Sequence, residues 1–197
     1  MKISGRSKGI KRLMSTHVLV LMPICVGFNL VGGAIAGTLK LPFFLDVIGT
    51  ILAAVMAGPL VGGVVGLLTN VFLALMVNPV NLPYGAVSVS VGVVTGLFGK
   101  RGFFKPRGLV VIWLVVSLIS AIVTSLVTVY LFGGATGATG TSVITAGLIT
   151  VMKNIWQGVL TAAIVQNLVD RGISLVMAYL IIKKIPPRFL QQLGNGS

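Results

Sequence analysis

The sequence contains few charged residues and almost no acidic ones. Only 9% of its 197 residues are charged, and only two of them are acidic. A typical soluble domain carries about 25% charged residues. So few charges cannot cover a water-exposed surface, whereas 56% of the residues are hydrophobic. The composition therefore excludes an ordinary soluble domain and predicts a chain whose main solvent is lipid.

The residue types that catalysis and metal binding need are also scarce. The single cysteine, Cys25, allows no disulfide within the chain, and the single histidine, His17, excludes the usual zinc-ligand spacings. Gly99-Lys100 is not part of a phosphate-binding loop, because Val94 stands where such a loop has its first glycine. Two acids and one histidine supply neither a carboxylate pair nor a Ser-His-Asp set. We expect a protein that is not an enzyme and uses no metal or cofactor.

Positive charge, by contrast, is abundant, because fifteen Lys and Arg residues give a net charge of +13. These residues lie in blocks between apolar segments rather than along one soluble face. This distribution argues against a nucleic-acid partner. Lys and Arg accumulate in the cytoplasmic loops of membrane proteins and set their orientation. The charge pattern therefore indicates membrane topology, with the lipid bilayer as the surroundings.

The apolar segments predict six transmembrane helices in a single membrane domain. A helix needs about 20 apolar residues to cross the hydrocarbon core. Gly58-Pro59 separates the second segment from the third, because proline breaks a helix. Spacings such as Gly62/Gly66 would let neighbouring helices approach closely in lipid. The predicted spans are about 17–37, 42–57, 60–77, 84–99, 109–132 and 162–182.

The segment 142–161 is apolar enough to be a seventh span, but the distribution of charge argues against it. With six spans, the N-terminal segment, the 100–107 loop and the C-terminal segment lie on one side, which we expect to be cytoplasmic. A seventh span would move the C-terminal basic residues outside. We therefore expect 142–161 to be an outer-face or re-entrant helix, a lid over a pocket. The shared side would hold Lys2, Arg6, Lys8, Lys11, Arg12, Lys100, Arg101, Lys105, Arg107, Lys183, Lys184 and Arg188.

Both acids, Asp46 and Asp170, lie inside apolar segments. A charge within the membrane usually pairs with another charge or lines a polar cavity. Asp170 is followed by Arg171, and an ion pair of Asp46 with Arg171 or with Lys153 would neutralise the site. These acids could form a structural ion pair that fixes the register of the helices, or they could contact a substrate directly. The two roles can coexist.

Uncharged polar residues are concentrated in the same outer half of the predicted bundle. Apolar walls with a few convergent polar groups are typical of small-ligand sites. Any one of these residues could instead form an interhelical hydrogen bond, but their clustering favours a pocket, in which Trp156 and Tyr84 could stack on a ring. The candidate substrate-binding residues are Asn29, Asp46, Thr50, Asn70, Asn81, Tyr84, Ser88, Asn154, Trp156, Gln157, Asn167, Asp170 and Arg171.

Several segments resemble one family of transport proteins. They are Leu41–Thr50, the Gly-Pro ending followed by the glycine-spaced segment 58–63, the polar Asn70 in the third span, and the last span from Asn167 to Pro186. Together with the chain length, the six predicted spans and the basic N-terminus, they resemble the substrate-binding (S) components of energy-coupling factor (ECF) vitamin transporters.

The resemblance implies a function and a set of partners. An S component captures a small water-soluble vitamin or heterocyclic precursor on the outer face of a bacterial or archaeal cytoplasmic membrane. It then docks on a coupling membrane protein with two ATPase subunits, as part of an ABC-type importer. By position, the segments that would close over the ligand are 38–41, 78–83 and 153–157. The Ala-x-x-x-Ala pattern through which many members dock is absent from the first span.

Two other classes of function fit the same composition. A membrane sensory or scaffold module would use its polar core for structure alone, so that substitution of Asp46 or Trp156 would mainly lower stability. A stand-alone carrier or channel would transport its solute in liposomes without ATPase subunits. Co-purification of a coupling protein and two ATPases would favour the S component over both.

Overall fold

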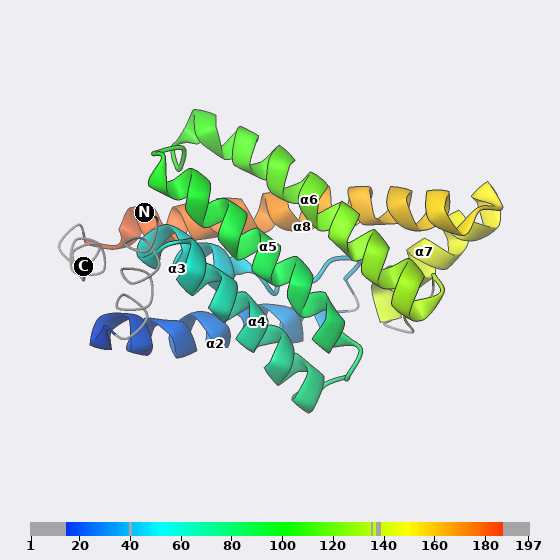
Figure 1. The fold of residues 1–197 in the computed structure, drawn as a ribbon, viewed down its shortest axis with the longest axis horizontal. Helices are drawn as coiled ribbons and strands as arrows, with labels where there is room; N and C mark the ends of the chain where they lie inside the picture. The colour runs from blue at the N-terminus through cyan, green and yellow to red at the C-terminus, as the bar shows by residue number, and fades with distance from the viewer. Residues whose placement is uncertain (1–14, 40, 135, 137–138, 187–197) are drawn as a thin grey trace, which may run out of the picture.

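The computed structural model describes residues 15–39, 41–134, 136 and 139–186, and this part of the chain is helical, without strands. Figure 1 shows the helices as one elongated bundle. This agrees with the predicted all-α fold. The helices are α2 (Thr16–Thr38), α3 (Ile48–Ala57), α4 (Pro59–Met76), α5 (Asn81–Lys100), α6 (Pro106–Phe132), α7 (Thr139–Met152) and α8 (Ile155–Lys184).

Five of these helices, α2, α4, α5, α6 and α8, are long and apolar enough to cross a membrane. The predicted second span, 42–57, differs from them. Its helix α3 has only ten residues, which rise about 15 Å and cover about half of a 30 Å hydrocarbon layer. Residues 41–47 before it are not helical, and we call them the strap. Pro42 accounts for the first of these residues, because the helical conformation is disfavoured for Leu41, the residue before the proline.

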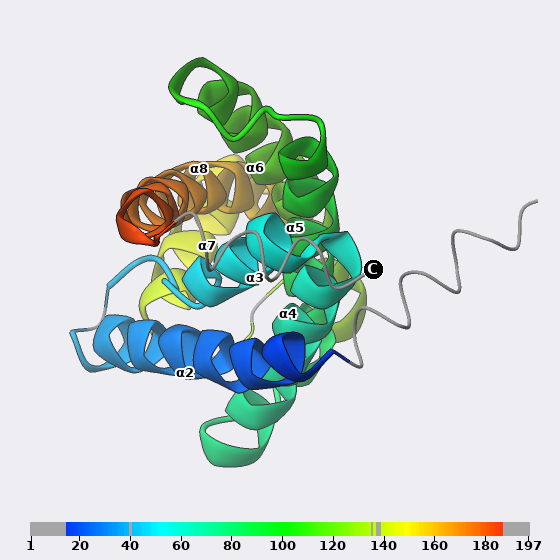
Figure 2. The ribbon, with the colours of Figure 1, turned by 90° about the vertical axis from the view of Figure 1, so that its left-hand side faces the viewer.

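Helix α3 lies inside the bundle, and the partly exposed strap leads into it. Nine of the ten residues of α3 are buried, and the helix is surrounded by α2, α4, α5 and α8 (Figure 2). Val47, Ile51, Val61 and Ile112 are among the large side chains fully buried in the core. Since Asp46 lies two residues before this buried helix, the strap brings a partly buried acidic residue next to the core.

Helices α4 and α5 pack closely because glycine leaves room for the neighbouring backbone. A Cβ atom at Gly92 would lie 2.3 Å from the backbone of Gly62, and one at Gly66 would lie 2.6 Å from the carbonyl oxygen of Ser88. Neither distance is compatible with a side chain. The predicted role of the Gly62/Gly66 spacing is therefore confirmed, as close packing of helices in lipid leads one to expect.

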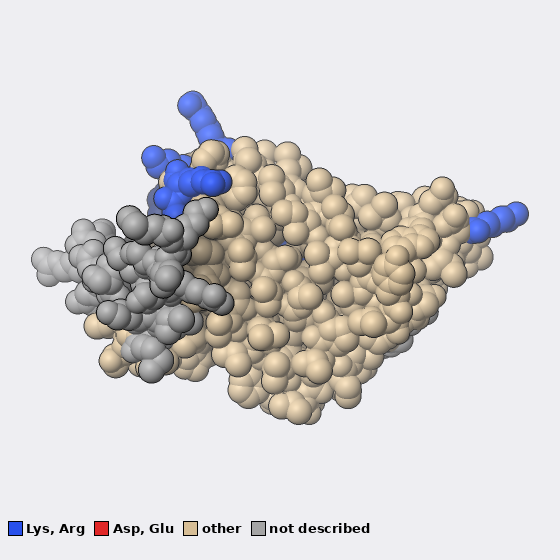
Figure 3. Space-filling view, viewed as in Figure 1, with Lys and Arg blue, Asp and Glu red and all other residues tan. Residues whose placement is uncertain are grey.

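The described basic residues are strongly segregated along the bundle. The start of α2, the α5–α6 turn and the end of α8 lie at one end (Figure 1). Lys and Arg side chains gather there, whereas the blue side chain at the opposite end marks the α7–α8 junction, where Lys153 lies (Figure 3). This matches the expected grouping of the 100–107 loop with Lys183 and Lys184. The predicted cytoplasmic residues 2–12 and Arg188, as well as Lys40, lie outside the described residues.

The predicted lid segment 142–161 and last span 162–182 have different boundaries in the structure. Helix α7 ends at Met152, and α8 begins at Ile155 rather than near 162. Asn154 caps α8, because its side-chain oxygen accepts a 3.2 Å hydrogen bond from the Gln157 N–H. Lys153 adopts a positive φ of 51°, which turns the chain between the two helices. The polar cluster 153–157 is therefore a helix junction.

Candidate functional site

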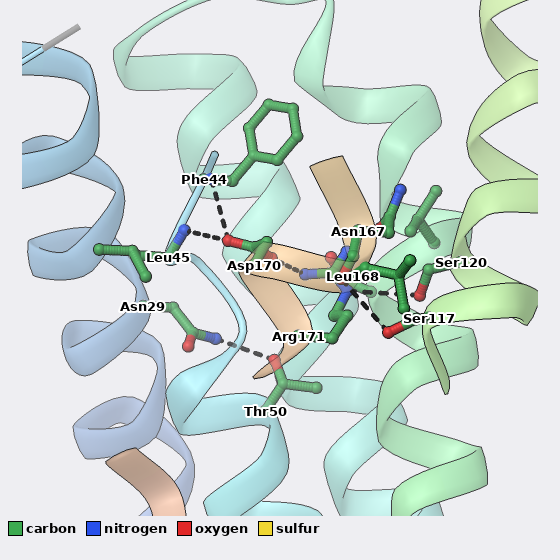
Figure 4. Close-up of polar contacts among 12 residues, drawn as sticks. Asn29, Phe44, Leu45, Thr50, Ser117, Ser120, Asn167, Leu168, Asp170 and Arg171 are labelled. Atoms are coloured by element: carbon green, nitrogen blue, oxygen red, sulfur yellow. Dashed lines mark hydrogen bonds and ion pairs between the residues drawn. The ribbon is translucent and has the colours of Figure 1, made fainter. Parts of the chain in front are cut away.

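Asp170 of α8 connects the strap to the rest of the bundle. One carboxylate oxygen accepts hydrogen bonds from the backbone N–H groups of Phe44, at 3.0 Å, and Leu45, at 2.8 Å. The other oxygen pairs with the Arg171 guanidinium, which also donates from Nε to the Ser120 hydroxyl at 3.3 Å (Figure 4). Asp170 is fully buried, and a buried charge requires partners. One cation and two backbone N–H groups fill this requirement.

Neither of the two cations expected to pair with Asp46 does so in the structure. Arg171 pairs with Asp170, and Lys153 is exposed at the α7–α8 junction. Within the described part of the chain, the Asp46 carboxylate has no ion pair and no side-chain hydrogen bond. Neighbouring residues of a helix point in different directions, but the long, flexible arginine side chain can reach back to the residue before it. The sequence alone could not show whether Arg171 forms its ion pair with Asp46 or with Asp170.

The strap is also held on its other side, by α2. A Cβ atom at Gly32 would lie 2.2 Å from the Leu45 carbonyl oxygen, so only glycine permits this approach. Leu45 itself has a φ of 52°, a conformation that L-residues with bulky side chains rarely adopt. The contacts with Gly32 and Asp170 fix this strained residue from opposite sides.

Beside the strap lies a cavity of about 70 Å³ that we call the polar chamber. Phe44 and Asp46 of the strap line it together with side chains of α4, α5, α6, α7 and α8. Its lining residues include the first part of α5 and the last part of α6, and these parts of the two helices lie away from the α5–α6 turn (Figure 1). Its polar lining residues are Asp46, Asn70, Asn81, Tyr84, Ser88, Thr124, Thr128, Thr136, Thr141, Ser142, Thr145, Gln166 and Arg171.

A second cavity of about 550 Å³, which we call the vestibule, adjoins the polar chamber. It lies between α2, the strap and the end of α4, and its walls are mainly apolar, with Leu30, Leu73 and Met76 among them. Phe44, Asp46, Val80, Asn81 and Thr141 line both cavities. The chamber alone has room for a few water molecules. A larger solute would occupy the chamber and the vestibule together.

Hydrogen bonds between helices set the walls of the chamber. Asn70 donates to the Ser88 hydroxyl at 2.7 Å, and the hydroxyls of Tyr84 and Thr128 are 2.7 Å apart. Gln166 donates to the Thr141 carbonyl oxygen at 3.2 Å. These contacts join α4 to α5, α5 to α6, and α7 to α8. Several polar groups of the cavity are therefore positioned by the protein itself before a ligand arrives.

Residues 17–182 match the model of a protein family described as ECF transporter, substrate-specific component. The chain belongs to this family. No curated protein and no solved structure matches the chain. The predicted resemblance is thereby confirmed, and the protein is a substrate-binding subunit of a transporter, a role in transport rather than in catalysis. The apolar helices agree with a multi-pass membrane protein.

About half of the predicted binding residues of this S component come together in the cavity. The residues that line the polar chamber are Asp46, Asn70, Asn81, Tyr84, Ser88 and Arg171. Asp170 does not line it, because both of its oxygens face partners within the protein. Some acids and amides near the strap therefore line the cavity, whereas others form hydrogen bonds or ion pairs that stabilise the elements around it.

The other predicted residues lie outside the cavity. Asn29 is buried between α2, α3 and α4, where it donates to the hydroxyls of Thr50, at 2.9 Å, and Thr69, at 2.8 Å, and accepts from the Gly49 N–H. Asn167 donates to the Ala163 carbonyl oxygen in its own helix. These groups serve packing, because a buried amide without partners would be costly.

Asn154, Trp156 and Gln157 are exposed at the junction of α7 and α8. The Trp156 ring is 43% exposed and meets the Tyr130 ring edge to face at a centroid distance of 5.5 Å. It contacts neither the chamber nor the vestibule. A Trp beside polar residues at a helix end is typical of the membrane interface.

The sequence analysis missed the hydroxyl-bearing walls that α6 and α7 supply. Ser117, Ser120, Thr124 and Thr128 recur every three or four residues along an otherwise apolar helix and therefore share one face. Of these, Thr124 and Thr128 reach the chamber, as do Thr141, Ser142 and Thr145 of α7. The helical spacing of small hydroxyl residues was the signal that could have identified them.

Proposed function

We propose that this S component captures a small water-soluble vitamin or heterocyclic precursor in the polar chamber and the vestibule. One observation carries the proposal: the two cavities share Asp46 in their walls, and amides, hydroxyls and an aromatic ring line the space beside it. A solute of this kind has polar groups to match and a ring that apolar walls can hold. Its capture would be the first step of uptake.

The proposed topology has six crossings with both termini in the cytoplasm. The strap and α3 together would form the second crossing, since non-helical backbone is tolerated at membrane depth where protein covers it. Support comes from the basic residues of the α5–α6 turn and the end of α8, which share one end of the bundle. The cavity would then face the outside.

The proposed lid consists of α7, with the strap and the α4–α5 connection beside it. Thr141, Ser142 and Thr145 of α7 line the chamber, and α7 packs along the first part of α8. Asn81, at the start of α5, and Phe44 of the strap complete the rim shared with the vestibule. Small displacements of these segments would open a path for the solute.

The proposed partners are a coupling membrane protein and two ATPase subunits in the cytoplasmic membrane of a bacterium or archaeon. The chain has no phosphate-binding loop of its own, so energy for uptake would come from such a complex. Family membership supports this assembly. Because the Ala-x-x-x-Ala pattern is absent, docking would use a different surface.

Two experiments test the proposal. The purified full-length protein, titrated with a panel of vitamins and nucleobases, is expected to bind one of them with submicromolar affinity, and mass spectrometry is expected to find the same compound in the protein as purified. Cells that express the chain with a coupling protein and two ATPases are expected to accumulate that compound. Absence of any submicromolar ligand, or uptake without ATPases, would contradict the proposal.

A further inference from the structure

The charges around the cavity do not balance. Arg171 lines the polar chamber, but its charge is matched by Asp170, with which it forms an ion pair. Asp46 lines both the chamber and the vestibule, and its carboxylate has no cationic partner among the described residues. Among the residues that the structure describes, no other acidic or basic side chain lines either cavity. Within this part of the chain, the cavity lining therefore presents one unmatched negative charge.

The neighbouring ion pair cannot relieve that imbalance. Asp170 already uses one oxygen for Phe44 and Leu45 and the other for Arg171. If Arg171 turned toward Asp46, it would leave a fully buried Asp170 without its cation, and an unpaired buried charge is strongly destabilising. A carboxylate at membrane depth needs a partner, and the open cavity beside Asp46 is where one can enter.

The surroundings of Asp46 indicate the kind of cation. Phe44 and Tyr84 offer aromatic rings, which attract organic cations through their faces. On the chamber side of Asp46 there are amides and hydroxyls, such as Asn70 and Thr128, whereas the vestibule side is mainly apolar. A compact inorganic ion would use only the carboxylate and hydroxyls and would leave the rings and the vestibule without a function.

We propose that the substrate of this protein is an organic cation with one positive charge, whose charged nitrogen pairs with Asp46 where the chamber meets the vestibule. Its hydrogen-bonding end occupies the polar chamber, and its less polar end occupies the vestibule. The inference rests on the proposed function and adds the charge class and the orientation of the solute. Protonated amines, amidines and quaternary heterocycles belong to this class, whereas carboxylate-bearing vitamins are excluded by repulsion from Asp46.

The test compares ligand charge with the charge at position 46. The purified full-length protein is titrated with thiamine and pyridoxamine as cations, with pyridoxine and riboflavin as neutral compounds, and with biotin and pantothenate as anions. Pyridoxamine and pyridoxine form a matched pair that differs in the charged amine. We expect submicromolar binding only among the cations. We also expect Asp46→Asn to weaken it about tenfold or more, as loss of a hydrogen-bonded charge partner does.

The controls separate charge from folding. Asp46→Glu keeps the charge and should retain more affinity than Asp46→Asn, and Lys153→Gln removes a charge outside the cavity and should leave affinity unchanged. Thermal unfolding of each variant shows whether it folds. If Asp46→Asn does not fold, the charge class of the bound compound and the Asp46→Glu titration still decide the matter.

The possible failures are distinguishable. Tight binding of a neutral or anionic compound that Asp46→Asn does not weaken would overturn the inference while leaving the proposed function intact. Tight binding of a neutral compound only in sodium chloride, and not in potassium chloride, would also overturn it, because sodium would then balance Asp46. Absence of tight binding in all three charge classes would overturn both proposals.

Discussion

The Asp170 carboxylate on α8 accepts a 2.8 Å hydrogen bond from the backbone N–H of Leu45, a residue that lies 125 positions earlier in the chain. Through this bond, the last apolar helix holds the non-helical strap and thereby places Asp46 beside the cavity. Asp170 is thus an acid that builds the site, whereas Asp46 faces the space where a solute would bind. The two acids of the chain differ in role because their surroundings differ.

Asp170→Asn is expected to loosen the strap and destabilise the protein. The amide retains one oxygen for the backbone N–H groups, but Arg171 loses its counter-charge in a buried position, which costs about 3–5 kcal/mol. Thermal unfolding measures the loss of stability, and hydrogen exchange at the backbone N–H groups of Phe44 and Leu45 shows whether the strap has loosened. Replacing both Asp170 and Arg171 by leucine should restore part of the stability. Unchanged exchange at Phe44 and Leu45 in Asp170→Asn would contradict this role.

Gly32→Ala is expected to displace the strap from α2. The new Cβ atom would lie 2.2 Å from the Leu45 carbonyl oxygen, and overpacking of this kind costs about 1–3 kcal/mol. The matched control is Gly27→Ala, in the same helix, where a Cβ atom meets nothing within 4 Å. It should be neutral or slightly stabilising. Equal melting temperatures of the two variants would show that the strap does not need this close approach.

Asn29→Ala is expected to lower stability without changing ligand affinity in the protein that remains folded. The variant leaves the Gly49 N–H and the hydroxyls of Thr50 and Thr69 without their amide partner, and each unsatisfied buried group costs about 1–3 kcal/mol. Unfolding and binding are measured on the same preparation. A large loss of affinity at unchanged stability would assign Asn29 to the binding site instead.

Thr124→Val is expected to weaken ligand binding by up to about tenfold, because it replaces a hydroxyl of the chamber wall by a methyl group of similar size. Its control is Ser125→Ala. Ser125 is buried in the same helix but donates to the Ala121 carbonyl oxygen and does not line the chamber. Titration with the compound found in the purified protein distinguishes them. Equal affinities would exclude the α6 hydroxyl wall from the site.

Trp156→Ala is expected to leave ligand affinity within about twofold, since its ring is outside both cavities and packs on Tyr130. Phe44→Ala, by contrast, removes a ring that lines both cavities, and aromatic contacts of a bound cation contribute about 0.5–2 kcal/mol. We expect it to weaken binding severalfold. If Trp156→Ala weakened binding more than Phe44→Ala did, Trp156 would belong to the binding site.

The helical class and most of the helices followed from the sequence because hydrophobic length and proline position are local properties. Helices α4, α5 and α6 begin or end near their predicted bounds, with Pro59 and Pro106 in the first turns of α4 and α6. The second span was harder to predict. Residues 41–47 are apolar except for Asp46, so hydropathy cannot distinguish a helix from a strap in which Asp170 accepts hydrogen bonds from two backbone N–H groups.

The candidate site was only partly predictable. Asp46, Asn70, Tyr84 and Arg171 were found because polar residues in apolar segments are rare and easily seen. Asn29 and Asn154 have the same appearance in the sequence, yet one bridges helices and the other caps α8. The threonines of α6 and α7 were missed because a single hydroxyl group in an apolar helix indicates little by itself. Only their repeated helical spacing, which places them on one face, indicates a polar wall.

By itself, the sequence determined that lipid surrounds this protein, that its helices run between a basic end and a less charged one, and that two acids must be accommodated in apolar surroundings. These are consequences of composition and spacing along the chain. The tertiary structure alone decided which acid is neutralised by Arg171 and which faces the cavity. That choice depends on how close residues 44, 45 and 171 come to Asp170, and ion pairing and hydrogen bonding act only over such short distances in the folded chain.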